Sequence, residues 1–271
     1  MPPLPDLLQF EAELSGGCGL RDARWFKGYP RLEALCLRAG LRIHQERLFR
    51  MRTKRVTLFA GHYGSGKTNI AVNYAEHLKK QGKDVVIADL DIVNPYFRTK
   101  DSEDVLRAMG IDIISPEFAN SNVDLPALPS ALYGVVENRS RHAVMDIGGD
   151  DRGAYALGRF SPYILEENDY EMVFVVNFLR PLTPDADAAL EVMREIELAC
   201  SLPFTAIVNN TNLGRETTPK IVFDSAYEAH RLSEMSGLPV LFTSAEHSVA
   251  KMLKMTDVFP MTLQKRYFDI N

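Results

Sequence analysis

The sequence predicts an α/β fold in which a mostly parallel sheet lies between two layers of helices, a three-layer α-β-α arrangement. Three observations predict it. Uniformly apolar runs of strand length recur along the chain, helical patterns separate several of them, and polar or glycine-rich segments follow them. Strands that are apolar on both faces are typical of parallel sheets covered by helices. With 271 residues and 46% apolar composition, the chain can bury a core of this size.

The expected elements begin at residue 55. The run RVTLFA (55–60) is the first strand, and a helix is expected over 68–81 because apolar residues recur there at helical spacing and Gly82 can end it. A second helix is expected over 184–200, with Thr183 as its cap. The further expected strands are DVVIADL (84–90), IDIIS (111–115), HAVMDI (142–147), EMVFVVNF (171–178), FTAIVNN (204–210) and LPVLFT (238–243). Ligands of such sheets bind beyond the carboxyl ends of the strands.

Residues 1–50 differ from the rest, because they lack strand alternation and contain one helical stretch within 31–49. We expect an N-terminal extension outside the core fold and a main domain over 51–271. The alternative is a helical lid packed on that domain.

Composition and charge exclude several classes of protein. The net charge is -5, and residues 51–271 carry 23 Lys and Arg against 30 Asp and Glu, so no broad nucleic-acid surface is expected. The three cysteines have no metal-binding or disulfide spacing, which favours a reducing cytoplasm. The apolar runs are far shorter than the roughly 20 residues that span a bilayer, so no membrane segment is expected.

The segment GHYGSGKT (61–68) follows the first strand, stands before a helix, and satisfies the phosphate-loop motif GxxxxGK[ST]. Its glycines allow the backbone to turn N–H groups toward phosphate oxygens, and the helix adds its positive end. Lys67 is expected to bridge the β- and γ-phosphates, and Thr68 to bind Mg²⁺. The residues predicted to contact the nucleotide here are Gly61, His62, Gly64, Ser65, Gly66, Lys67, Thr68 and Asn69.

Two carboxylates, Asp89 and Asp91, end the second strand. Their spacing places both on one side of an extended chain, so one can order the waters of Mg²⁺ while the other orients the attacking water. The alternative is that Asp91 caps a turn and Asp89 solvates the strand end.

Two later strand ends add candidate site residues. Asp146 ends the strand HAVMDI and is the expected second acid for Mg²⁺, and Gly149 can offer its N–H to the γ-phosphate. Asn209 or Asn210 can read the edge of adenine with an amide, unless the pair only forms a turn. No Asn-Lys-x-Asp segment for guanine is present.

With these segments in this order, residues 55 to about 260 resemble the MinD/ParA-type P-loop ATPases of the SIMIBI class. The resemblance implies Mg-ATP hydrolysis in a homodimer that acts as a nucleotide-dependent switch on a protein client. It also implies that Asp91 positions the water, that Asp146 belongs to the metal shell, and that Asn209 or Asn210 contacts adenine.

The departure from that family is His62, where its members carry a lysine that stabilises transition-state charge. Three interpretations remain open: hydrolysis is slow, another cation replaces the lysine, or the dimer switch is lost. Arg98, Arg152 and Arg180 are the candidate cations, and Arg98 is favoured because it closely follows Asp91.

The family's metal-inserting, membrane-cycling and DNA-partitioning members carry features that are absent here, which leaves a protein client as the most economical expectation. One alternative is a small-molecule kinase or ATP-dependent ligase, with residues 94–98 and 115–126 lining an acceptor pocket. Another is a nucleotide-binding module with negligible turnover.

Overall fold

A computed structural model of the chain describes residues 53–90, 103–114, 133–135, 138–149 and 151–263, without the side chains of residues 151, 152, 154 and 156. The protein divides into two units, Met1–Arg47 and Leu48–Asn271, and every described residue belongs to the second. The expected extension over 1–50 lies outside the described residues, so its separation from the core fold stays a prediction.

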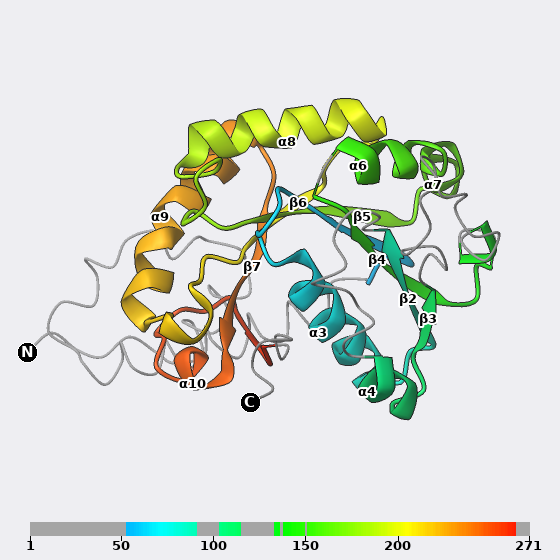
Figure 1. Ribbon diagram of the computed structural model, residues 1–271, viewed down its shortest axis with the longest axis horizontal. Helices are drawn as coiled ribbons and strands as arrows, with labels where there is room; N and C mark the ends of the chain where they lie inside the picture. The colour runs from blue at the N-terminus through cyan, green and yellow to red at the C-terminus, as the bar shows by residue number, and fades with distance from the viewer. Residues whose placement is uncertain (1–52, 91–102, 115–132, 136–137, 150, 264–271) are drawn as a thin grey trace, which may run out of the picture. The chain divides into compact units, whose positions relative to one another are not determined.

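The described strands form one sheet in the order β3-β2-β4-β1-β5-β6-β7-β8, and every neighbouring pair runs parallel (Figure 1). Their bounds are β1 (Val56–Ala60), β2 (Val85–Leu90), β3 (Asp112–Ile114), β4 (His142–Ile147), β5 (Tyr170–Val176), β6 (Ala206–Asn209), β7 (Val240–Glu246) and β8 (Val258–Met261). The predicted parallel sheet is confirmed.

Helices cover both faces of the sheet (Figure 1). Their bounds are α3 (Lys67–Lys80), α4 (Glu103–Ala108), α6 (Asp151–Gly158), α7 (Ser161–Glu167), α8 (Ala186–Cys200), α9 (Pro219–Ser236) and α10 (His247–Ala250), with a 3-10 turn η4 (Gly214–Glu216). Apolar side chains of α3 and α4 pack on one face, and those of α6, α7, α8 and α9 pack on the other. The predicted three-layer arrangement is therefore also confirmed.

Alternation along the strands decides which side chains meet which helices. In β4, Met145 and Ile147 join the core under α8, whereas Val144 joins the core under α3. In β2, Leu90 points to the α8 side and Ile87 to the α3 side. Side chains alternate along a strand. The carboxylates of Asp89 and Asp146, two residues beyond Ile87 and Val144 respectively, therefore lie on the α3 side of the sheet.

The first turn of α8 differs from the prediction. Its cap is Asp185, whose carboxylate accepts a 2.9 Å hydrogen bond from the backbone N–H of Ala188. The predicted cap Thr183 instead donates its hydroxyl to the carbonyl oxygen of Asn177 at 2.9 Å. The prediction was wrong because serine, threonine and aspartate all cap helices well, and the loop before the helix makes use of Thr183.

Strand β8 was not predicted. It lies at the edge of the sheet and contains Pro260, which an edge strand tolerates because one side of its backbone has no partner among the described strands. Thr262, which directly follows β8, makes two backbone hydrogen bonds with the side chain of Asn73 on α3, at 2.8 and 2.9 Å. The edge of the sheet is thereby fixed to the helix that follows the phosphate loop.

Candidate functional site

The loop between β1 and α3 lies at the carboxyl end of the central strands, where the sequence predicts a phosphate loop. Gly64 and Gly66 have φ of 77° and 89°, a conformation that favours glycine. A Cβ at Gly61 would overlap the carbonyl oxygen of Val175 in β5, and one at Gly66 would overlap the side-chain amide of Asn210. The glycines therefore allow both the turn of this loop and its close packing against β5 and the end of β6.

Lys67 is buried at the start of α3, and its Nζ donates a 3.3 Å hydrogen bond to the carbonyl oxygen of His62. A Cβ at Gly149 would lie 2.8 Å from this Nζ and 2.7 Å from the backbone nitrogen of Tyr63. Gly149 therefore lies directly against the loop and its lysine, and its contact with the γ-phosphate stays a prediction.

His62 does not extend away from the loop as a long cationic side chain would. Its Nδ1 lies 3.0 Å from the carbonyl oxygen of Tyr63, a geometry in which the ring nitrogen donates a proton. The aromatic ring of Tyr63 is about half exposed beside it. The loop thus presents an imidazole and a phenol at positions 62 and 63.

Thr68 and Asp146 meet although 78 positions separate them in the chain. The hydroxyl of Thr68 donates a 2.5 Å hydrogen bond to Oδ2 of Asp146. Asp146 is 1% exposed, and so is Asp89, its direct register partner on β2. Since paired residues of neighbouring strands point to the same face, both carboxylates lie on the α3 side, at the start of that helix.

These residues suit Mg²⁺. This ion binds oxygen ligands, takes one or two carboxylates from the protein, and keeps several waters. The hydroxyl of Thr68 and the carboxylates of Asp146 and Asp89 form such a donor set beneath the glycine loop. The described residues contain no group of three or more His, Cys, Asp or Glu that could hold a metal by itself. The donor set therefore fits a metal that arrives with phosphate and water.

Asn210 holds the phosphate loop. Its amide nitrogen donates a 2.6 Å hydrogen bond to the carbonyl oxygen of Ser65, and its amide oxygen accepts from the hydroxyl of Ser244 at 2.6 Å and from Nδ2 of Asn212 at 3.2 Å. The residue is 1% exposed. The ends of β6 and β7 therefore support the loop through one side chain.

Asn209 is used in the same internal way. Its amide nitrogen donates to the hydroxyl of Ser225, and its amide oxygen accepts from the backbone and the hydroxyl of Thr211. It has no exposed surface. Both amides therefore hydrogen-bond to protein partners in this structure, and a contact of Asn209 or Asn210 with the adenine edge stays a prediction.

Arg180 also reaches the loop. It lies between β5 and α8, and its Nε donates a 2.8 Å hydrogen bond to the carbonyl oxygen of Gly64. Of the three cations proposed to replace the missing lysine, it is the one whose side chain the structure describes. The favoured candidate, Arg98, lies outside the described residues, as do Asp91 and residues 94–98 and 115–126. The side chain of Arg152 also lies outside them.

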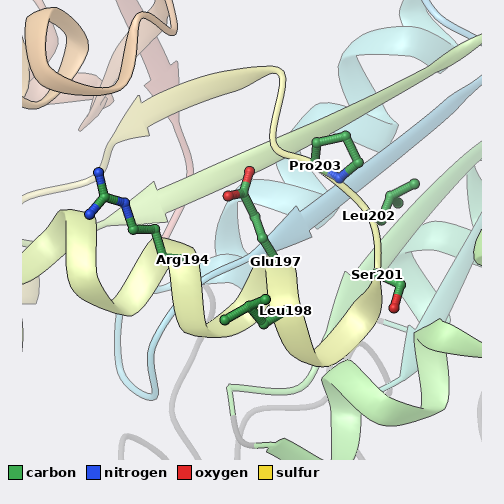
Figure 2. A pocket seen from close by; sticks show the side chains of 6 residues that line it. All are labelled: Arg194, Glu197, Leu198, Ser201, Leu202 and Pro203. Carbon is green, nitrogen blue, oxygen red and sulfur yellow. The ribbon is translucent and has the colours of Figure 1, made fainter.

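An apolar hollow of about 420 Å³ lies elsewhere, at the end of α8 (Figure 2). It is lined by Arg194, Glu197, Leu198, Ser201, Leu202 and Pro203. These residues precede the start of β6, so the hollow lies toward the amino ends of the strands, whereas the phosphate loop follows the carboxyl end of β1. Among the described helices, none combines the length and the apolar character needed to cross a bilayer.

No protein-family model and no curated protein sequence matches the chain. Many solved structures are similar to it, and they include the following three. FtsY from Mycoplasma mycoides has 13% identity and a TM-score of 0.49 over 82% of this chain and 70% of its own. Chloroplast FtsY from Physcomitrella patens has 19% identity and a TM-score of 0.46 over 79% and 68%.

The third is the signal recognition particle 54 kDa protein from Aeropyrum pernix K1 in complex with GDP, with 13% identity and a TM-score of 0.48. The match covers 86% of this chain and about half of that protein, 51%. These values assign no nucleotide, activity or partner. The protein has a P-loop NTPase fold. Its features are the parallel sheet, the glycine loop between β1 and α3, and the contact of Thr68 with Asp146 beside that loop.

Proposed function

We propose that this protein binds a nucleoside triphosphate with Mg²⁺ and hydrolyses it as a switch for a protein client. One observation carries the proposal: the hydroxyl of Thr68 lies 2.5 Å from the carboxylate of Asp146 directly below a glycine loop. A threonine hydroxyl and a strand-end carboxylate are the groups that hold Mg²⁺ in phosphate-loop enzymes. When bound, the metal would supply charge neutralisation at the terminal phosphates.

The chain's own residues would bind and orient the phosphates. The backbone N–H groups of residues 61–68 and the start of α3 provide an anion site, and Lys67 adds a buried positive charge. We propose that Gly149, beside that lysine, donates its N–H to the γ-phosphate. Asp91 is proposed as the residue that orients the attacking water, and Arg98 as a source of transition-state charge.

ATP is the proposed nucleotide, because the sequence lacks the Asn-Lys-x-Asp segment that reads guanine. The amides of Asn209 and Asn210, proposed to contact adenine, hydrogen-bond to protein groups, so both nucleotides belong in the test.

We further propose that a second copy of the chain covers the mouth of the site in the nucleotide-bound state. Large apolar side chains that follow the carboxyl ends of β1, β5 and β6 support this. Tyr63, Leu179, Leu182 and Leu213 are each between 44% and 55% exposed. Light scattering with and without Mg-ATP tests the dimer, and an unchanged monomer mass in both would contradict it.

Calorimetric titration tests nucleotide binding. Mg-ATP and Mg-GTP are each titrated. We expect Mg-ATP to bind the wild-type protein more tightly than Mg-GTP, and Lys67→Ala to weaken the binding by about 10- to 100-fold, since a charged hydrogen bond contributes about 1.5–3 kcal/mol. Lys80→Ala is the matched control, because Lys80 is exposed in the last turn of the same helix. Equal binding by the two variants, or no binding by the wild type, would refute the proposal.

Hydrolysis is tested separately, by phosphate release from Mg-ATP without an added acceptor. Tight binding without release would favour the nucleotide-binding module with negligible turnover, the alternative that the histidine at position 62 supports.

A further inference from the structure

The segment that carries Arg180 is held in a fixed shape by hydrogen bonds. The side-chain oxygen of Asn177 accepts a hydrogen bond from the backbone N–H of Leu179 at 3.0 Å. The backbone carbonyl oxygen of Asn177 accepts from the hydroxyl of Thr183 at 2.9 Å and from the backbone N–H of Arg180 at 3.1 Å. Asn177 and Thr183 are 1% and 2% exposed. Arg180 therefore lies in a turn that these hydrogen bonds hold in place.

The guanidinium of Arg180 packs against the phosphate loop. Its Nε donates to the carbonyl oxygen of Gly64 at 2.8 Å, and a Cβ at Gly64 would lie 3.6 Å from the central carbon of the guanidinium. Among the described residues, Nη1 and Nη2 of Arg180 have no hydrogen-bond partner. One edge of the planar cation is used to hold the loop, which leaves four N–H groups for a ligand.

The strand order shows which part of a nucleotide Arg180 would meet. The metal-binding groups belong to β4 and β2, on one side of β1, and Nζ of Lys67 lies near Gly149, which follows β4. Arg180 follows β5, on the other side of β1. If the phosphates that bind Mg²⁺ lie next to Thr68, the nucleoside extends toward β5 and β6.

We infer that Arg180 contacts the nucleoside half of the nucleotide, with its guanidinium plane against the base and its remaining N–H groups toward the ribose. This inference rests on the proposed function. Arginine is suited to the role because its planar, weakly hydrated cation stacks on aromatic faces. The amides of Asn209 and Asn210 are buried and bonded to protein groups, so a contact of Arg180 with the base would add to whatever these residues provide.

Calorimetry with two kinds of ligand tests the inference. The first kind is the Mg²⁺ complex of the β,γ-imido analogue of ATP or of GTP, and the second is Mg²⁺-tripolyphosphate, which has no nucleoside. We expect Arg180→Ala to weaken nucleotide binding by about tenfold and to leave tripolyphosphate binding unchanged, as a desolvated cation–π contact contributes about 1–2 kcal/mol. Arg180→Lys should show the same selective loss, because lysine keeps the charge without the plane.

Arg194→Ala is the matched control. It removes the same side chain at an exposed position of α8, where Arg194 lines the hollow near the start of β6 (Figure 2), and should bind both ligands like the wild type. Thermal melting confirms that each variant folds, and Arg180→Lys carries the test if Arg180→Ala does not.

Other outcomes would overturn the inference. An equal loss of both ligands in Arg180→Ala and Arg180→Lys would make the residue only a support for Gly64. Weakened tripolyphosphate binding that lysine restores would make it a phosphate-binding charge. If the wild-type protein binds neither ligand, the proposed function itself fails, and this result is seen before any variant is compared.

Discussion

The side-chain amide of Asn210 donates a 2.6 Å hydrogen bond to the carbonyl oxygen of Ser65, a residue 145 positions earlier in the chain. We expect Asn210→Ala to lower the free energy of unfolding by about 1–3 kcal/mol, because buried polar partners lose their hydrogen bonds, and to weaken nucleotide binding as well. Chemical denaturation and calorimetry measure the two effects. Asn138→Ala is the control, since Asn138 is exposed and bonds locally to Ser140. Equal stability of the two variants would contradict the assigned role.

Thr68 allows a direct test of the metal site. Thr68→Ala removes the hydroxyl that bonds to Asp146, so we expect added Mg²⁺ to improve nucleotide binding much less than in the wild type, by about tenfold less. Thr68→Ser keeps the hydroxyl and should retain the Mg²⁺ effect. Titrations with and without Mg²⁺ measure this difference. A serine variant as impaired as the alanine variant would show that packing of the threonine methyl group, and not the hydroxyl, matters.

Substitution of Gly149 tests how closely the loop after β4 packs against the phosphate loop. A methyl group there would lie within 2.9 Å of Tyr63 backbone atoms and of Nζ of Lys67. We therefore expect Gly149→Ala to weaken nucleotide binding by about tenfold, because overpacking costs about 1–3 kcal/mol. In Gly134→Ala the new methyl group meets nothing within 4 Å, and that variant should bind like the wild type. Unchanged binding by Gly149→Ala would mean that the two loops separate easily.

Glu171 gives a pH-dependent prediction. Burial raises the pKa of its carboxyl group above the ordinary value of 4.5, and the charge of Lys54 opposes the shift. A group whose pKa is raised in the folded protein contributes stability that is fully present below its unfolded pKa. This contribution is lost as the pH rises through the folded pKa. Glu171→Gln should therefore gain stability relative to the wild type between pH 4.5 and 7.

Denaturation curves at several pH values measure this gain. Glu195→Gln makes the same chemical change at an exposed position of α8 and serves as the control. A constant difference between Glu171→Gln and the wild type at every pH would refute the predicted titration.

The fold could be predicted because most strands are apolar on both faces. The segment of β4 is buried from Ala143 to Ile147, and so is the segment of β1 from Val56 to Ala60. Such runs exist in a chain only where a sheet is covered on both sides. Strand β8 escaped prediction because it is only partly buried, includes Pro260, and lies at the edge of the sheet.

The candidate site could be predicted in part. The glycine loop has a sequence signature, since fixed spacing of glycine, lysine and threonine is needed to surround a phosphate. The contacts of Asn210 and Arg180 with that loop have no such signature, because each joins residues more than 100 positions apart. A polar pair at a strand end suggests ligand binding and loop support equally well, and only the three-dimensional arrangement distinguishes them.

The support that Asn210 and Ser244 give to the loop has a consequence for biosynthesis. A ribosome releases residues 61–68 early, but the two side chains that hold them emerge only after β6 and most of β7 have been made. Until then the nascent polypeptide carries its glycine-rich turn without these braces. If the loop binds a nucleotide as proposed, capture of the nucleotide would be among the last steps of maturation, and incomplete translation products should fail to retain it.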